Sequence, residues 1–176
     1  KLYGNVGAVK SVKLPNTVNK IDEGAFCGMV NLKEIVLPDS LKVIENNLLC
    51  GDKSLTKITV GVAVRDIEKN AFSGVKNLHK LAIKSANRNY VVKDGFLLNN
   101  GKKELLYAIP TKKKLKIPSS VEKITCKIGS EVNPSSLVLG KNVKKISKEF
   151  FYNSKIKSIK VAKTNKTFAM SGKSLY

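Results

Sequence analysis

One sequence motif, the repeated phrase of this chain, recurs about every 23 residues. Its clearest copy runs from Leu14 to Ile35 and reads L-P-x-x-V-x-x-I-x-x-x-A-F-x-G-x-x-N-L-x-x-I. A repeat of this length is typical of a solenoid, because a single unit cannot bury its apolar side chains and must stack on its neighbours. Five positions of the phrase recur in register: Leu14, Leu37, Val60 and Ile83; Ile21, Ile44 and Ile67; Phe26, Leu49 and Phe72; Gly28, Gly51 and Gly74; and Leu32, Leu55 and Leu78.

Each copy contains the pattern L-x-x-L-x-L, which is typical of the strand of a leucine-rich repeat. Alternating side chains of a strand point to opposite faces, so Ile35 and Leu37 are expected inside and Glu34 outside. A proline then ends the strand, because proline cannot donate to a ladder of hydrogen bonds. The next apolar pair, Leu41 and Ile44 in the second copy, predicts a second short strand or extended turn.

The segments 22–26 and 68–72 complete each coil, and we expect each to form one helical turn. Phe26 and Phe72 are expected to point into the core. Gly28, two residues after the first Phe, would allow the backbone to turn the corner, since glycine adopts positive φ without strain.

The charge of the chain is strongly positive and unevenly distributed. The 176 residues include 33 basic and 13 acidic side chains, a net charge of +20. Residues 1–83 account for only +4 of this charge and residues 84–176 for +16. Two interpretations remain open: a lysine-rich, solvated surface, or an electrostatic footprint for a polyanion.

No apolar stretch approaches the length of a transmembrane helix, so no transmembrane segment is expected in this chain. The first residues fall in mid-repeat, because Leu2-Tyr3 occupies the positions of Ala25-Phe26. Since the end of a solenoid needs a cap, we expect the chain to be a fragment or processed form of a longer protein. Any export signal would then lie outside this sequence.

The repeated phrase resembles the BspA-type leucine-rich repeat family, whose members are surface and secreted proteins of gut and oral bacteria and of some protists. The resemblance implies an α/β, β-rich fold: a right-handed leucine-rich-repeat solenoid of about seven coils, with short helical turns. It also implies a secreted or cell-surface location. The family often has Cys three residues after the Phe; here Met29, Asp52 and Val75 occupy that position.

The period is interrupted once, between Ile83 and Ile117. We expect a β-hairpin insert at about 87–110, because two apolar runs flank Asn99-Asn100-Gly101. The start of this insert, N-x-x-Y, recurs near the end as Asn165-x-x-Phe168. Between these two sites the repeat resumes with a step of about 22 residues, with Phe151 expected at the Phe position. We expect residues 1–176 to form a single solenoid domain.

No combination of residues in the sequence indicates catalysis, so the chain is not expected to be an enzyme. The only histidine, His79, is expected to be an ordinary residue at a strand end. The phosphate-binding, zinc-protease and C-x-x-C motifs are absent, so no metal and no cofactor are expected. Asn165-Lys166-Thr167 matches a glycosylation sequon.

Cys27 and Cys50 lie 23 residues apart and therefore stack on neighbouring coils. We favour two small buried thiols here, because cysteine often serves as a small apolar residue. A disulfide is the alternative, since adjacent strands are about 4.8 Å apart and a disulfide spans this distance. Cys126 has no stacked partner, and this odd cysteine weakly disfavours a disulfide framework.

The outward strand positions form the candidate binding face, because repeat proteins bind partners along such extended surfaces. This face has no exposed aromatic residue, which argues against base stacking on single-stranded nucleic acid. The charged residues of the candidate face are Lys13, Glu34, Lys57, Lys80, Lys114, Lys116 and Lys160. A candidate polyanion patch consists of two lysine-rich runs on neighbouring coils: Lys112, Lys113, Lys114 and Lys116, and Lys141, Lys144, Lys145 and Lys148.

Our leading hypothesis is a non-enzymatic binding module of a secreted or cell-surface protein. The family resemblance implies adhesion, with a protein of the host or of a neighbouring cell as the partner. One alternative is binding of an anionic polysaccharide or nucleic acid through the basic second half. The other alternative is a structural spacer that displays another domain.

Overall fold

The computed structural model describes residues 8–110, 113–126 and 132–176. They fall into two compact units, Lys1–Val92 and Lys93–Tyr176, which are described in turn. The half-coil expected around Leu2-Tyr3 lies outside the described residues, as does Lys112.

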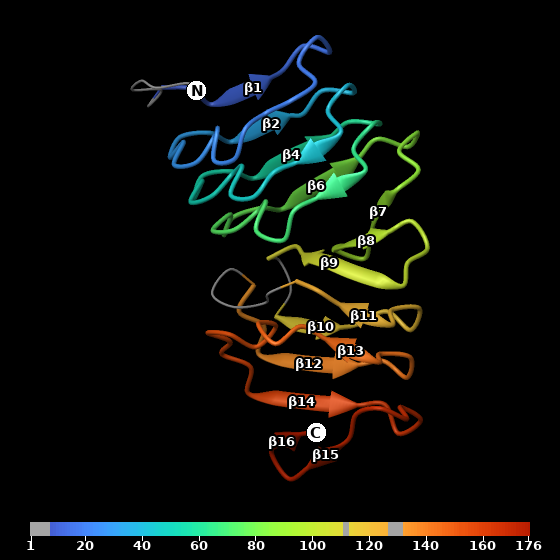
Figure 1. Cartoon of the computed structure of the whole chain (residues 1–176). Helices are drawn as coiled ribbons and strands as arrows, with labels where there is room; N and C mark the ends of the chain where they lie inside the picture. The colour runs from blue at the N-terminus through green and yellow to red at the C-terminus, as the bar shows by residue number, and fades with distance from the viewer. Residues whose placement is uncertain (1–7, 111–112, 127–131) are drawn as a thin grey trace. The chain divides into compact units, whose positions relative to one another are not determined.

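Four parallel strands form the main sheet of the first unit, in the order β1-β2-β4-β6 (Figure 1). The register is that of the sequence repeat, because Val12, Ile35, Ile58 and Leu81 align across the sheet. The predicted strands are therefore confirmed, and β1 and β2 each end two residues before a proline. The bounds of the strands are β1 Ser11–Lys13, β2 Glu34–Val36, β4 Lys57–Val60 and β6 Lys80–Ile83.

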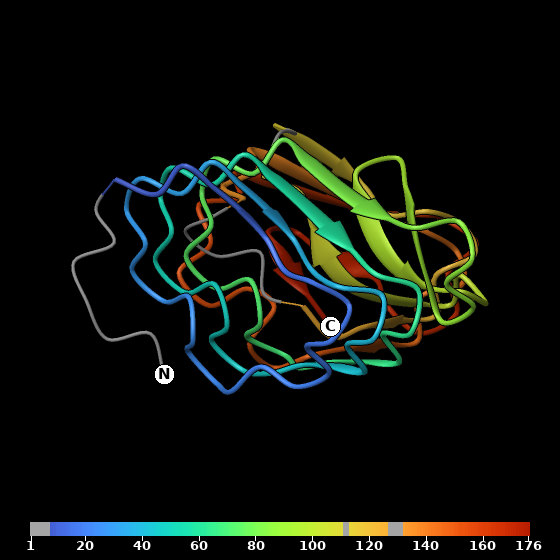
Figure 2. The ribbon, with the colours of Figure 1, turned by 90° about the horizontal axis from the view of Figure 1, so that it is seen from above.

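A second, smaller sheet of this unit consists of β3 (Val43–Ile44) and β5 (Asp66–Ile67), paired in parallel. β3 matches the second strand predicted at Leu41 and Ile44, and β5 is its equivalent one period later. The inward side chains of the two sheets form the core, and Ile35, Ile44 and Ile58 are completely buried. Seen from above, successive coils of this unit follow similar outlines (Figure 2). This stacking buries apolar side chains that a lone coil would leave exposed.

The corners predicted to be helical are turns, and the residues that the structure describes contain no helix. Backbone groups here bond to the next coil instead of within a helix: Phe26 N–H donates to the Leu48 carbonyl and Gly28 N–H to the Cys50 carbonyl. Phe26 and Phe72 are buried, as predicted. The corner glycines have the expected positive φ angles: 77° at Gly28, 74° at Gly51 and 81° at Gly74.

The second unit begins with the predicted hairpin. Strands β8 and β9 pair antiparallel on either side of Asn99-Asn100-Gly101, and the Asn99 side chain accepts hydrogen bonds from the N–H groups of Lys103 and Glu104. The inserted hairpin is therefore confirmed. The strands of this segment are β7 Tyr90–Lys93, which crosses the boundary of the two units, β8 Phe96–Asn99 and β9 Glu104–Ala108.

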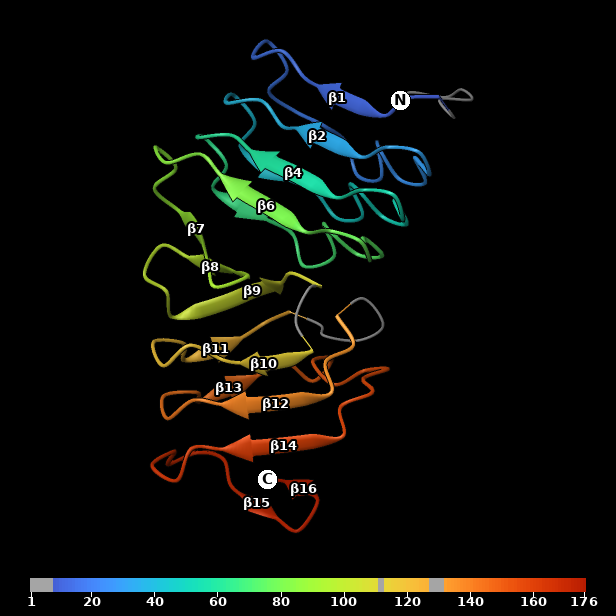
Figure 3. The same ribbon diagram turned by 180° about the vertical axis from the view of Figure 1, so that it is seen from behind.

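Two sheets of parallel strands follow the hairpin. One has the strand order β10-β12-β14, and in the other β13, β11 and β9 lie side by side (Figures 1 and 3). An antiparallel pair, β15 and β16, completes the described part of this unit. The bounds are β10 Lys114–Lys116, β11 Lys123–Ile124, β12 Ser136–Leu139, β13 Lys145–Ile146, β14 Ser158–Val161, β15 Met170–Ser171 and β16 Ser174–Leu175.

In the second unit, the buried ring of the corner is one residue before the predicted Phe position. Phe150 is completely buried, whereas Phe151, which the repeat predicts at this position, is only half-buried. Phe150 N–H donates to the Ser147 carbonyl in a local turn, and its ring packs edge-to-face on Phe151. Asn153, two residues after Phe151, has a positive φ of 56°, as Gly28 and Gly74 have two residues after Phe26 and Phe72. Phe151 therefore occupies the predicted Phe position, but its ring is not the one that fills the core.

Candidate binding surfaces

The outward residues of the β1-β2-β4-β6 sheet form a surface that we call the first strand face. The strand register places them in two columns, as the sequence predicts. One column combines an acid, two bases and a hydroxyl, and the other a base, a hydroxyl and two apolar groups. The columns are Ser11, Glu34, Lys57 and Lys80, and Lys13, Val36, Thr59 and Ala82.

Charge is balanced at the centre of the first strand face. The Lys57 Nζ atom lies 2.5 Å from a Glu34 carboxylate oxygen on the adjacent strand. Both side chains are about a third exposed, so water screens the pair and its contribution to stability is at most about 1 kcal/mol. The face therefore combines charged, polar and apolar groups within a small area, as protein interfaces do.

The outward residues of the β10-β12-β14 sheet form the second strand face, which is more basic. Lys114, Lys116 and Lys160 lie on it and are exposed. Hydrogen bonds align Lys113, Ser135 and Lys157 at the start of the three strands. The register forms the columns Lys114, Ser136 and Ser158, and Lys116, Val138 and Lys160.

The second predicted lysine run belongs to the other sheet of this unit. Lys145 lies on β13, next to Lys123 of β11. Lys144 lies 2.9 Å from Glu122, which also contacts Lys103 at 3.2 Å. The hydrogen bond from Lys144, followed by that from Lys103, lowers the pKa of Glu122. The two predicted runs thus lie on different sheets, and part of the second run is already neutralised.

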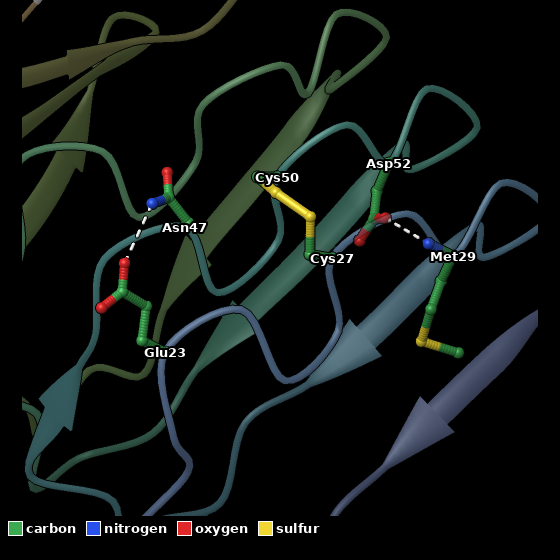
Figure 4. Close-up of a disulfide and its surroundings, with 6 residues drawn as sticks. All are labelled: Glu23, Cys27, Met29, Asn47, Cys50 and Asp52. Atoms are coloured by element: carbon green, nitrogen blue, oxygen red, sulfur yellow. Dashed lines mark hydrogen bonds between the residues drawn. A yellow bond between two sulfur atoms is a disulfide. The ribbon is translucent and has the colours of Figure 1, made fainter. Parts of the chain in front are cut away.

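Cys27 and Cys50 form a disulfide between neighbouring corners (Figure 4). The interpretation as two buried thiols is wrong, because Cys27 is exposed and Cys50 half-buried. The stacked corners hold the two Cα atoms 4.6 Å apart, within the range that a disulfide spans. Glu23 and Asn47 join the same two coils by a hydrogen bond of 3.0 Å.

Asp52 is a buried titratable residue that the sequence analysis did not single out. Its side chain is completely buried, and one carboxylate oxygen accepts a hydrogen bond of 2.6 Å from the Met29 N–H on the preceding coil (Figure 4). The other oxygen is buried without a hydrogen-bond partner. Burial raises the pKa of Asp52 to about 7. The sequence does contain a signal for this site: Asp52 is acidic, whereas Met29 and Val75 at the same position of the neighbouring copies are apolar.

The remaining candidates do not form a site. His79 is exposed and directly precedes β6, as expected. The Asn165 side-chain amide donates to the carbonyls of Gly140 and Val143, so the sequon asparagine is part of the internal packing. Burial raises the pKa of the Cys126 thiol to about 12, which keeps it protonated and unreactive.

These parallel coils define a leucine-rich-repeat β-solenoid. The family model of the BspA type leucine rich repeat region matches six copies in residues 1–100 and 99–171. The chain belongs to this family. Six copies do not confirm the expected count of about seven coils.

Two solved bacterial proteins have a similar fold. A leucine-rich repeat protein of Eubacterium ventriosum matches with a TM-score of 0.62 and 21% identity, over 86% of this chain and 54% of its own. The pneumococcal vaccine antigen PcpA matches with a TM-score of 0.61 and 18% identity, over 88% of this chain and 51% of its own. The chain thus spans about half the length of these proteins. No curated protein matches the sequence.

Repeat proteins of this family and fold are generally non-enzymatic binding modules. In the described residues, no helix is long and apolar enough to cross a lipid bilayer.

Proposed function

We propose that this chain is a protein-binding module of a secreted or cell-surface protein, and that it acts in adhesion through the first strand face. The observation that carries the proposal is the in-register pair of outward columns on β1, β2, β4 and β6. Their mixed chemistry suits a protein partner, because protein interfaces combine apolar contacts with scattered polar and charged groups.

A rigid surface supports this role. The disulfide and the hydrogen bonds between corners fix neighbouring coils, so little conformational entropy remains to be lost on binding. The external location is proposed from the family and from PcpA, which is described as a vaccine antigen. Lysines at the rim, such as Lys13 and Lys80, would steer an acidic partner and increase its association rate.

The test is binding of the immobilised chain to purified collagen, laminin and fibronectin by surface plasmon resonance. The face variant is E34A/K57A/T59A. We expect this variant to bind the partner of the parent at least about tenfold more weakly, which corresponds to about 1.4 kcal/mol of binding free energy.

The matched control is T17A/K42A/D66A, which removes an exposed acid, base and threonine from other parts of the same unit. It should leave the affinity within about twofold, since typical substitutions outside an interface change little. Equal weakening by both triple variants would contradict a binding role for the first strand face.

A further inference from the structure

Two described acidic residues of the second unit lie on or next to the sheet that contains β13, β11 and β9. Glu104 lies on β9 and contacts Lys123 of β11 at 2.8 Å. Glu122, one residue before β11, contacts Lys103 and Lys144. These ion pairs neutralise lysines of the β13-β11-β9 sheet and its turns, so the net positive charge of this sheet is reduced.

The second strand face lacks this compensation. As the structure describes them, β10, β12 and β14 contain no acidic residue. Lys114, Lys116 and Lys160 of this face are exposed, as are Lys113 and Lys157, which directly precede β10 and β14. None of the five forms an ion pair with another described residue, although acids of the same unit form pairs on the other sheet. The uneven charge of the sequence thus becomes a cationic surface on one sheet.

The strand geometry sets the spacing of the lysines on this face. Lys116 and Lys160 are aligned with one strand between them, which places their backbones roughly 10 Å apart. Lys114 and Lys116 point to the same side of β10 and are roughly 7 Å apart along the strand. Ser136 and Ser158 lie in the same column as Lys114 and add hydroxyl groups next to the charges.

A linear anionic chain fits this array better than a folded protein. The outward side chains of these strands are three lysines, two serines and Val138, and no acid on the strands balances their charge, whereas Glu34 pairs with Lys57 on the first strand face. The outward positions also lack an aromatic platform on which single-stranded bases could stack. A polyanion needs neither feature, because release of its condensed counterions drives the association.

We propose that the second strand face binds a linear sulfated polysaccharide through Lys114, Lys116 and Lys160, with Lys113 and Lys157 adding charge at the start of the strands. Lysine suits this ligand, because its ammonium group is a compact charge with three donors that can adapt to sulfate groups at varying positions. The proposal concerns the second unit only and does not depend on the protein-binding role of the first strand face. If heparin binding failed, that role would remain standing.

The test uses heparin as the probe and the full chain. The affinity is measured by fluorescence titration at several NaCl concentrations for the parent, the face variant K114S/K116S/K160S and the control variant K141S/K145S/K148S. Both variants lose three exposed lysines and therefore the same net charge. Each lost contact should reduce the slope of log Kd against log[salt] by about 0.7–0.9, so the face variant should lose about two to three in slope.

We expect the slope of the control variant to differ from that of the parent by less than about 0.9, the contribution of one contact. An equal loss in both variants would show a nonspecific effect of net charge and overturn the proposal, as would unchanged binding by the face variant. Thermal unfolding of both variants checks that they fold.

Competition identifies the class of polyanion. A heparin fragment should displace labelled heparin at a lower charge concentration than poly-glutamate or oligo-thymidine does. If either competitor displaced it more effectively, the ligand would be an acidic protein or a nucleic acid, and the proposal would be wrong.

Discussion

The two units build the same parallel coil but distribute charge on it differently. On the first strand face, Glu34 lies opposite Lys57 and neutralises it. At the equivalent place on the second strand face, Ser136 lies opposite Lys114. The coil therefore does not dictate the chemistry of its outward surface, because outward side chains are not needed for stacking. The same fold can present a mixed surface in one unit and a cationic surface in the other.

The units also differ in how their corners are held. In the first unit, a disulfide, a buried carboxylate and glycines with positive φ fix the corners. In the second unit, Phe150 and Phe151 pack against each other in a corner whose positive φ belongs to Asn153. Covalent and polar bonds in one corner thus correspond to aromatic packing in the other. Four predictions, from the largest effect to the smallest, test this contrast.

The largest effect is expected at the buried aromatic residue of this corner in the second unit. F150A should reduce the free energy of unfolding by about 3–5 kcal/mol, because it leaves a cavity at a completely buried site. F151A should cost clearly less, since its ring is only half-buried. Chemical denaturation of both variants measures the difference. A larger loss in F151A would show that Phe151, and not Phe150, fills the core of this corner.

Removal of the disulfide should come next. C27S/C50S should lower the free energy of unfolding by about 3 kcal/mol, because a closed loop of this length restricts the unfolded chain. A reducing agent should have a similar effect on the parent and almost none on the double variant. If the reduced parent kept its full stability in urea denaturation, the disulfide would not hold the first unit together.

Asp52 should make stability depend on pH. Its pKa is about 7 in the folded protein and 3.8 without burial, so between these values the folded state holds a proton that the unfolded state has lost. Stability should therefore fall as the pH rises, by about 2 kcal/mol between about pH 5 and pH 7.

D52N should flatten this pH dependence, because the amide that replaces the carboxyl group cannot ionise but keeps an acceptor for the Met29 N–H. The measurement is urea denaturation of parent and variant at a series of pH values. The slope with pH is the decisive quantity, since the buried amide alters the absolute stability as well. Parallel pH profiles would contradict a buried, titrating Asp52.

The smallest effect should follow from giving the second strand face the charge pattern of the first. S136E places a carboxylate opposite Lys114, as Glu34 lies opposite Lys57. We expect a gain in stability of roughly 0.2–1 kcal/mol that disappears in about 1 M salt. The control S136Q should show no salt-dependent gain. An equal gain in both variants would indicate packing instead of charge pairing.

Much of the fold could be predicted from the sequence. The repeat period set the strand positions and the register, because stacked coils must align residues one period apart; Ile35 and Ile58 are therefore both neighbours in the sheet and completely buried. The inserted hairpin could be predicted for a similarly local reason, since Asn99 orders the turn by bonding to Lys103 and Glu104.

The corners could not be predicted in the same way. Their conformation depends on hydrogen bonds between coils, such as Phe26 N–H to the Leu48 carbonyl, and not on local helix propensity. The same inter-coil geometry makes Cys27 and Cys50 partners and gives Asp52 the Met29 N–H as a donor. In the second unit, Phe150 is the buried ring, although Phe151 occupies the Phe position of the repeat.

The repeat, the strand register and the excess of positive charge follow from the order of the residues, because they depend on which residues recur and how often. Where that charge remains unneutralised depends on the tertiary structure. Glu104 and Glu122 reach lysines on neighbouring coils of one sheet, whereas Lys114, Lys116 and Lys160 lie on the other sheet. Charge pairing acts over a few ångströms in space, between residues that the chain order keeps far apart.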